Sequence, residues 1–116
     1  MKFLFILNDA AYGTERAYNG LRLAGALGKS AENEVRMFLI GDAVTCAKAG
    51  QKVPQGFYSI ELMVDRVIRN KGQVGLCGSC MDARAVDATE IVEGAHRSSM
   101  EELAQWSQWA DKIAVF

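Results

Sequence analysis

The chain has few of the residues that stiffen a backbone, form disulfides or bind metal ions: it has one proline, one histidine and three cysteines in 116 residues. An odd number of cysteines argues against a disulfide framework. A structural zinc site needs four ligands, and beyond Cys77 and Cys80 only Cys46 and His96 remain as thiol or imidazole donors. Because neither of them forms a second closely spaced pair, we expect no metal site and no cofactor.

Long apolar runs are also missing. Met1 and Lys2 are followed by only five apolar residues before Asn8. Such a run is too short for a signal-peptide core and far below the ~20 residues that span a bilayer. The formal net charge is −1, and the thirteen Lys and Arg residues are scattered instead of forming a basic stripe. We therefore expect a cytoplasmic protein that binds neither membrane nor nucleic acid.

The length and composition predict one domain, residues 1–116. Half of the residues are apolar and 23% are charged. A domain of this size has a large surface relative to its volume, so some apolar area must stay exposed or be covered by other chains. We expect a homo-oligomer.

Apolar runs alternate with helical patterns along the chain. The runs predict strands at 3–7, 35–40, 73–76 and 112–116, and residues 85–92 fit either a short strand or a helical turn. Helices are predicted at 14–27, 43–49, 60–71 and 98–109, the second with Asp42 as its N-cap. This alternation is typical of βαβ units and predicts an α/β fold: three α/β/α layers around a mostly parallel sheet of about five strands.

In an open parallel sheet, ligands bind beyond the carboxyl ends of the strands. The loops at 8–13, 41–42 and 77–84 should therefore emerge together at one edge. They supply the candidate catalytic residues Cys77, Cys80 and Arg84, and the candidate substrate-binding residues Asn8, Tyr12, Gly13, Asp42 and Asp82. Of these, Asp82 is expected to orient Arg84 or to cap a turn.

The segment from Leu76 to Arg84 places two thiols two residues apart, directly after a predicted strand. Two thiols at this spacing can share an electron pair, a metal ion or a sulfur atom. Arg84 lies close enough in a compact turn to face the sulfur of Cys77, and a nearby cation lowers a thiol pKa. A sulfur-carrying thiol, a zinc ligand and a dithiol oxidoreductase all remain open on these grounds. We expect Cys46 to be a core residue and His96 to lie in a loop, at the surface or an interface, without a partner.

Taken together, these segments resemble the DsrE/DsrF-like sulfur-relay family, and more closely its small YchN-like members. The resemblance covers essentially the whole chain; it rests on the Asn8–Gly13 loop and on the motifs Leu21-Arg22-Leu23-Ala24, Phe38-Leu39-Ile40-Gly41-Asp42-Ala43-Val44, Leu76-Cys77-x-x-Cys80-x-Asp82-x-Arg84 and Glu102-Leu103-Ala104-Gln105-Trp106.

The resemblance implies a homo-oligomer, often a hexamer built from trimers, and a cysteine that carries sulfur as a persulfide between donor and acceptor proteins. Carried over to this chain, the carrier is Cys77, with Cys80 as a second and resolving thiol. Ala85 stands where the family pattern has a glycine after the arginine.

Overall fold

The computed structural model describes residues 1–116 and shows five parallel strands in the order β4-β3-β2-β1-β5. The elements are β1 (Lys2–Leu7), α1 (Arg16–Leu27), β2 (Glu34–Leu39), the 3-10 helix η1 (Gly41–Ala47), α2 (Ile60–Arg69), β3 (Gln73–Cys77), α3 (Gly78–Ala83), the 3-10 helix η2 (Ala88–Glu90), β4 (Ala95–Ser98), α4 (Met100–Trp109) and β5 (Lys112–Val115). The predicted α/β fold with about five mostly parallel strands is confirmed.

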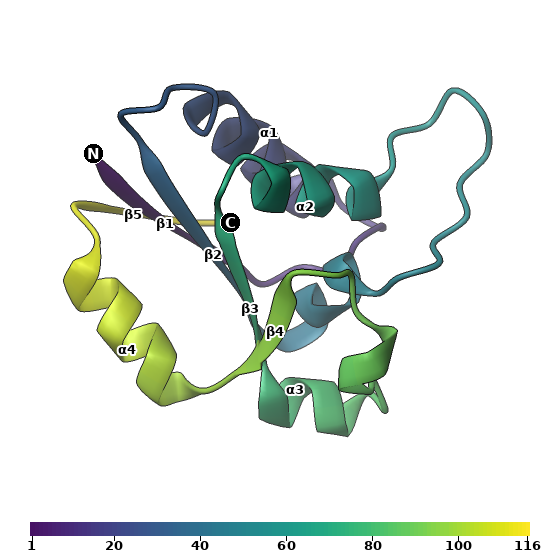
Figure 1. Ribbon diagram of the computed structural model, residues 1–116. Helices are drawn as coiled ribbons and strands as arrows, with labels where there is room; N and C mark the ends of the chain where they lie inside the picture. The colour runs from purple at the N-terminus through teal and green to yellow at the C-terminus, as the bar shows by residue number, and fades with distance from the viewer.

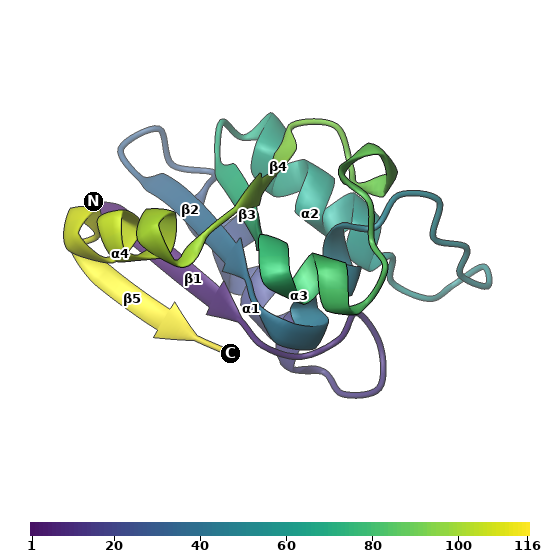
Figure 2. The ribbon, with the colours of Figure 1, turned by 90° about the horizontal axis from the view of Figure 1, so that it is seen from below.

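The helices cover the sheet unequally. Helices α1 and α2 lie together on one face, and α4 alone lies on the other (Figures 1 and 2). On the α4 face, the Arg36 guanidinium stacks 3.9 Å from the Trp109 ring centroid, and Phe38 meets Trp106 edge to face at 6.3 Å. Trp106 is therefore a core residue that joins α4 to the middle of the sheet.

Strand β3 leads directly into the thiol pair and is held on both sides. It pairs with β2 from Arg36↔Gln73 to Leu39↔Leu76, and with β4 from Val74↔Ala95 to Cys77↔Ser98. Gly75 allows α4 to approach, because a Cβ atom there would lie 3.2 Å from Trp106 and 3.1 Å from Ser98. The last residue of β3 thus has a fixed position at the carboxyl edge.

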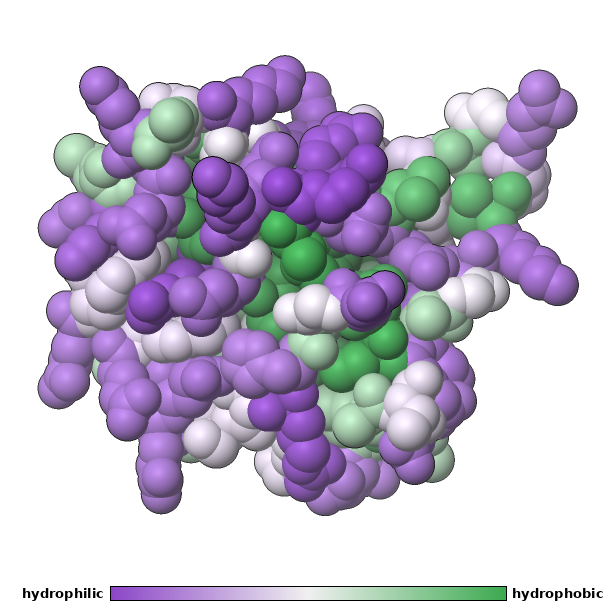
Figure 3. All heavy atoms as spheres, in the orientation of Figure 1, coloured by the Kyte–Doolittle hydropathy of each residue, from purple (hydrophilic) through white to green (hydrophobic).

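The loop between η1 and α2 projects from the body of the molecule (Figure 1). Figure 3 shows a mostly hydrophilic surface on this side, with hydrophobic side chains near the centre and on the projecting loop. Within the loop Phe57 is 70% exposed, whereas Tyr58 turns inward and stacks on Tyr18 with 4.1 Å between ring centroids. The base of the loop is consequently anchored while its tip is in solvent.

Several predicted boundaries need correction. The helix predicted at 43–49 is the 3-10 helix η1, which begins at Gly41, and Asp42 lies in its first turn instead of capping it. Residues 85–92 contain η2 and an isolated bridge between Lys48 and Ile91. The strand next to β3 lies later, at Ala95–Ser98, where the sequence predicts a loop. Helix α4 begins at Met100, with Ser99 as its N-cap.

Candidate functional site

The candidate site lies where β2 and β3 end. Cys77 is the last residue of β3 and precedes α3, and Cys80 follows in the first turn of that helix. Both are free thiols; Cys77 is 7% exposed and Cys80 is half-buried. The change from strand to helix within one peptide unit brings the two side chains together, as the Cys-x-x-Cys spacing predicts.

Cys77 ionises more readily than an ordinary thiol. Burial raises the pKa of its thiol, but hydrogen bonds from the side chains and backbone amides of Cys80 and Ser79 together lower the pKa by more, so the net pKa lies below that of an ordinary thiol. The hydroxyl oxygen of Ser79 is 3.4 Å from the Cys77 sulfur. Because a thiolate is the nucleophilic form of cysteine, this arrangement prepares Cys77 for reaction.

Cys80 is held as the protonated partner. Burial raises the pKa of the Cys80 thiol and the contact with Cys77 raises it again; the Gly41 amide and the charge of Arg84 lower it, and the net pKa lies above its ordinary value. The Gly41 N–H donates to the Cys80 sulfur at 3.2 Å. The two thiols are therefore chemically unequal, with the negative charge on Cys77.

Arg84 does not act as the sequence predicts. Its Nε donates to a carboxylate oxygen of Asp42 at 2.9 Å, its Nη2 lies 2.8 Å from the same oxygen in an ion pair, and its Nη1 donates to the carbonyl of Cys80 at 3.1 Å. The charge of Arg84 acts on Cys80, and none of the groups that shift the pKa of Cys77 is an arginine. The expectation that Arg84 faces the Cys77 sulfur is wrong, because Asp42 draws its guanidinium toward η1.

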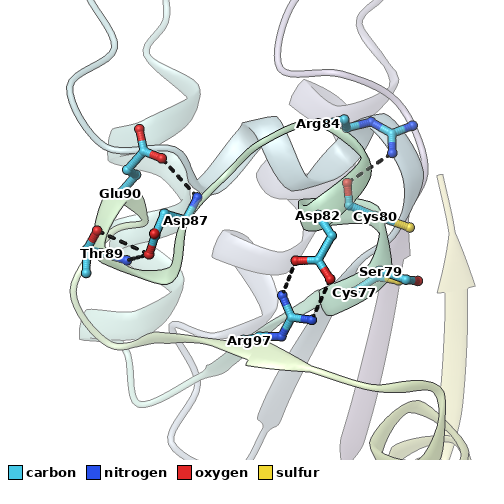
Figure 4. A network of polar contacts seen from close by, with 9 residues as sticks. All are labelled: Cys77, Ser79, Cys80, Asp82, Arg84, Asp87, Thr89, Glu90 and Arg97. Carbon is cyan, nitrogen blue, oxygen red and sulfur yellow. Dashed lines mark hydrogen bonds and ion pairs between the residues drawn. The ribbon is translucent and has the colours of Figure 1, made fainter.

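Asp82 is paired with an arginine that sequence reasoning missed. Figure 4 shows its carboxylate turned away from Arg84 and toward Arg97 on β4, with two hydrogen bonds of 2.7 and 2.9 Å. The guanidinium of Arg97 covers Gly78, where a Cβ would lie 2.8 Å from it. The bonds to Asp82 raise the pKa of Arg97 most, with a smaller contribution from the Cys77 charge. Arg97 is thus the ion-pair partner of Asp82 and packs over Gly78, next to Cys77.

Helix α3 ends in a tight turn at Ala85, which has a φ of 53°, in the left-handed region. The Val86 N–H bonds to the Met81 carbonyl at 2.9 Å and the Ala85 N–H to the Asp82 carbonyl at 3.2 Å. This pair of bonds is a Schellman motif, whose left-handed residue is usually glycine. The turn forms with alanine at that position, and it directs the chain away from the site after Arg84.

The loop at 8–13, after β1, contributes fewer residues to the surroundings of the thiols than the sequence predicts. Asn8 donates its side-chain amide to the Phe116 carbonyl at 3.1 Å. The Tyr12 hydroxyl donates to the Tyr58 carbonyl and accepts from the Ile60 N–H, so it fastens the base of the projecting loop. Gly13 lies in open space with a φ of 119°. Of the five predicted substrate-binding residues, the structure brings only Asp42 and Asp82 into the network around the thiols.

The other thiol and the single imidazole, those of Cys46 and His96, lie outside the network around Cys77 and Cys80. Cys46 is fully buried in the core, as predicted, and burial raises the pKa of its thiol to about 12. His96 has a partner that the sequence did not reveal: its Nε2 contacts the Glu102 carboxylate, and its ring meets Trp106 at 5.8 Å. No group of three or more His, Cys, Asp or Glu side chains is arranged to hold a metal ion. No helix is long and apolar enough to cross a membrane.

The fold and the site define a small parallel α/β protein with an unequal pair of free thiols at the carboxyl edge of its sheet. The chain belongs to the DsrE/DsrF-like family, whose model matches residues 1–116. That family is associated with sulfur relay.

Individual relatives match over nearly their full length. Protein YchN of Escherichia coli is 38% identical over 116 residues, which is 99% of this chain and 98% of the relative. A protein of Methanocaldococcus jannaschii is 34% identical over 117 residues, the whole of both chains. The crystal structure of the Escherichia coli YchN protein superimposes with a TM-score of 0.93 at 37% identity, covering 100% of this chain and 99% of that one.

Proposed function

We propose that this protein is a cytoplasmic persulfide carrier in sulfur relay, with Cys77 as the carrier thiol. The unequal ionisation of the thiol pair carries the proposal: Cys77 has the lowered pKa and Cys80 the raised one. Family membership supports the reaction class. A reducing compartment such as the cytoplasm fits a protein that works through free thiols.

The reaction has two balanced steps. First, the Cys77 thiolate attacks the outer sulfur of a donor persulfide, forms a sulfur–sulfur bond and releases the donor as a thiolate. An acceptor thiolate then attacks the outer sulfur of the Cys77 persulfide, and the Cys77 thiolate leaves with the electron pair. Contacts from Ser79 and Cys80 that stabilise the thiolate help in both steps, because Cys77 is the nucleophile in the first and the leaving group in the second.

Intact-mass spectrometry after incubation with glutathione persulfide tests this assignment. The native protein should gain the mass of one sulfur atom. Cys80→Ser and Cys46→Ser should gain it too, and Cys77→Ser should not. Failure of the native protein to gain sulfur, or uptake by Cys77→Ser at the native level, would falsify the carrier role.

The proposal extends to a homo-oligomer, with a trimer or hexamer expected from the family resemblance. Support comes from β5, an edge strand whose Ile113 and Val115 are 48% and 62% exposed. Apolar residues on an unpaired edge are a liability for a protein that stays monomeric. Light scattering on Ile113→Lys with Val115→Lys should give a smaller particle than the native protein. An unchanged particle mass would place the contact elsewhere.

A further inference from the structure

Three contacts link the start of η1, the first turn of α3 and Arg84 at the end of α3, and all of them act on Cys80 or on the residue that binds it. The Gly41 amide binds the Cys80 sulfur, Arg84 binds the Cys80 carbonyl, and Asp42 binds Arg84. We refer to Gly41, Asp42, Cys80 and Arg84 as the latch. It fixes Cys80 at both its main chain and its side chain.

We propose that the latch is a positioning device that protects the Cys77 persulfide from attack by Cys80, with Asp42 and Arg84 as its positioning residues. This inference rests on the carrier role proposed for Cys77. It gives Arg84 a task different from the activation of Cys77 that the sequence predicts, and it gives Asp42 a task other than substrate binding.

The reaction that the latch opposes is intramolecular. The Cys80 thiolate attacks the Cys77 sulfur of the persulfide, the bond to the outer sulfur breaks, and that sulfur leaves with the electron pair as hydrosulfide. The Cys80 sulfur is oxidised to the disulfide level, the Cys77 sulfur keeps the level it already has in the persulfide, and the outer sulfur is reduced to hydrosulfide, so no other oxidant is needed. For a carrier this step is a loss, because the sulfur never reaches an acceptor.

Disulfide formation requires movement that the latch resists. The two sulfur atoms must come within about 2 Å of each other. The Cys80 sulfur contacts Cys77 and also accepts a hydrogen bond from the Gly41 amide, 3.2 Å away, so its movement onto the Cys77 sulfur lengthens that bond. Gly41 has a φ of 60°, in the region that favours glycine, and an added Cβ there would lie 3.7 Å from the Asn8 carbonyl oxygen. Closing the disulfide therefore works against the contacts of the latch.

Two variants separate positioning from electrostatics. Asp42→Asn removes the charge that holds Arg84 and leaves the arginine unpaired near Cys80. Arg84→Gln removes the hydrogen bond to the Cys80 carbonyl. It also removes a positive charge that lowers the pKa of Cys80 and so stabilises its thiolate. If Arg84 acted only through its charge, hydrosulfide release would rise in Asp42→Asn and fall in Arg84→Gln. The latch predicts a rise in both.

The experiment loads each variant with glutathione persulfide, removes excess reagent, and follows released hydrosulfide together with the Cys77–Cys80 disulfide by mass spectrometry. We expect release about fivefold faster than native in Asp42→Asn, the ratio that corresponds to the ~1 kcal/mol upper range of an exposed ion pair. In Arg84→Gln we expect a smaller rise, because the lost charge disfavours the Cys80 thiolate. Higher salt should accelerate native release toward the variants, because the Asp42 and Arg84 side chains are 67% and 33% exposed.

Asp65→Asn and Arg69→Gln serve as matched controls, because these residues form an ion pair of the same kind on α2, at 2.9 Å and away from the thiols. They should release hydrosulfide at the native rate. Native or slower release from Arg84→Gln overturns the latch, whatever Asp42→Asn does. Absence of any persulfide on the native protein instead overturns the carrier role, so the two proposals fail in distinguishable ways.

Discussion

Cys46 and Cys77 follow neighbouring strands of one sheet, yet their thiols have opposite chemistry. Cys46 lies in η1 after β2, is fully buried, and donates to the Asp9 carbonyl at 3.7 Å. Cys77 ends β3, reaches the surface, and is surrounded by donors. Burial determines the pKa shift of Cys46, whereas hydrogen bonds together outweigh burial at Cys77, so two largely buried thiols of one sheet differ in reactivity.

Alkylation is the most direct way to break this comparison. Burial raises the pKa of Cys46 to about 12, whereas the contacts with Cys80 and Ser79 lower the pKa of Cys77. At pH 8 even an ordinary thiol, with a pKa of about 8.5, is ionised more than about a thousandfold more often than a thiol with a pKa of about 12. Iodoacetamide should therefore modify Cys77 more than about a thousandfold faster than Cys46, as measured by peptide mass spectrometry of the native protein. Comparable rates would mean that the two sites do not differ in ionisation.

A second prediction concerns the origin of the lowered pKa. Reactivity of Cys77 should increase as pH rises through its pKa, because the thiolate is the reacting form. Cys80→Ala removes a contact that lowers this pKa, so the midpoint should move to higher pH and the rate at pH 7 should fall several-fold. Cys80→Ser keeps a hydroxyl donor and should recover part of the rate. A midpoint that stays in place in Cys80→Ala would assign the shift to Ser79 and the backbone.

The two thiols should also differ in what they contribute to stability. Cys46→Ala leaves a small cavity in the core and should lower the free energy of unfolding by about 1 kcal/mol, with sulfur uptake unchanged. Cys77→Ala should do the reverse, abolishing uptake with a smaller effect on unfolding in urea. Loss of uptake in Cys46→Ala would contradict the separation of the two roles.

The smallest effect is expected at Ala85, beside the reactive thiol pair. Its left-handed backbone strains an alanine but not a glycine. Glycine also loses more entropy on folding, which offsets part of the gain. Ala85→Gly should therefore stabilise the protein by about 0.5 kcal/mol in urea unfolding. A destabilisation of similar size would show that the alanine methyl group makes useful contacts.

The sequence predicts the buried parts of this fold well. Strands β1, β2 and β3 are mostly apolar, and apart from the first residue of β2 and of β3 all their residues are buried or half-buried, which is the pattern of interior parallel strands. The cysteine pair and Asp42 follow two of these strands, so their convergence at one edge was also predictable. Cys46 could be assigned to the core because it shares a helical face with small residues.

The partners of the charged residues could not be predicted in this way. Strand β4 has the sequence Ala-His-Arg-Ser. This sequence lacks the alternation of apolar and polar residues that would have predicted a strand. Nothing in the sequence therefore singles out Arg97, although its register position beside Leu76 places it next to α3. For the same reason the sequence predicts that Asp82 orients Arg84, two residues further along the chain. Asp82 pairs with Arg97 and not with Arg84, because Arg84 at the end of α3 is turned toward Asp42.

The pairing of Cys77 with Ser98 has a mechanical consequence for a carrier. An atom on the last residue of a central strand cannot swing through space on a flexible arm; its reach is limited to rotation about one side-chain bond. Any reacting thiol must therefore approach Cys77, whose position is fixed and which is only 7% exposed to solvent. For the proposed carrier role, a donor or an acceptor would need a projecting thiol, such as a cysteine at a chain end or on an extended loop, to reach Cys77.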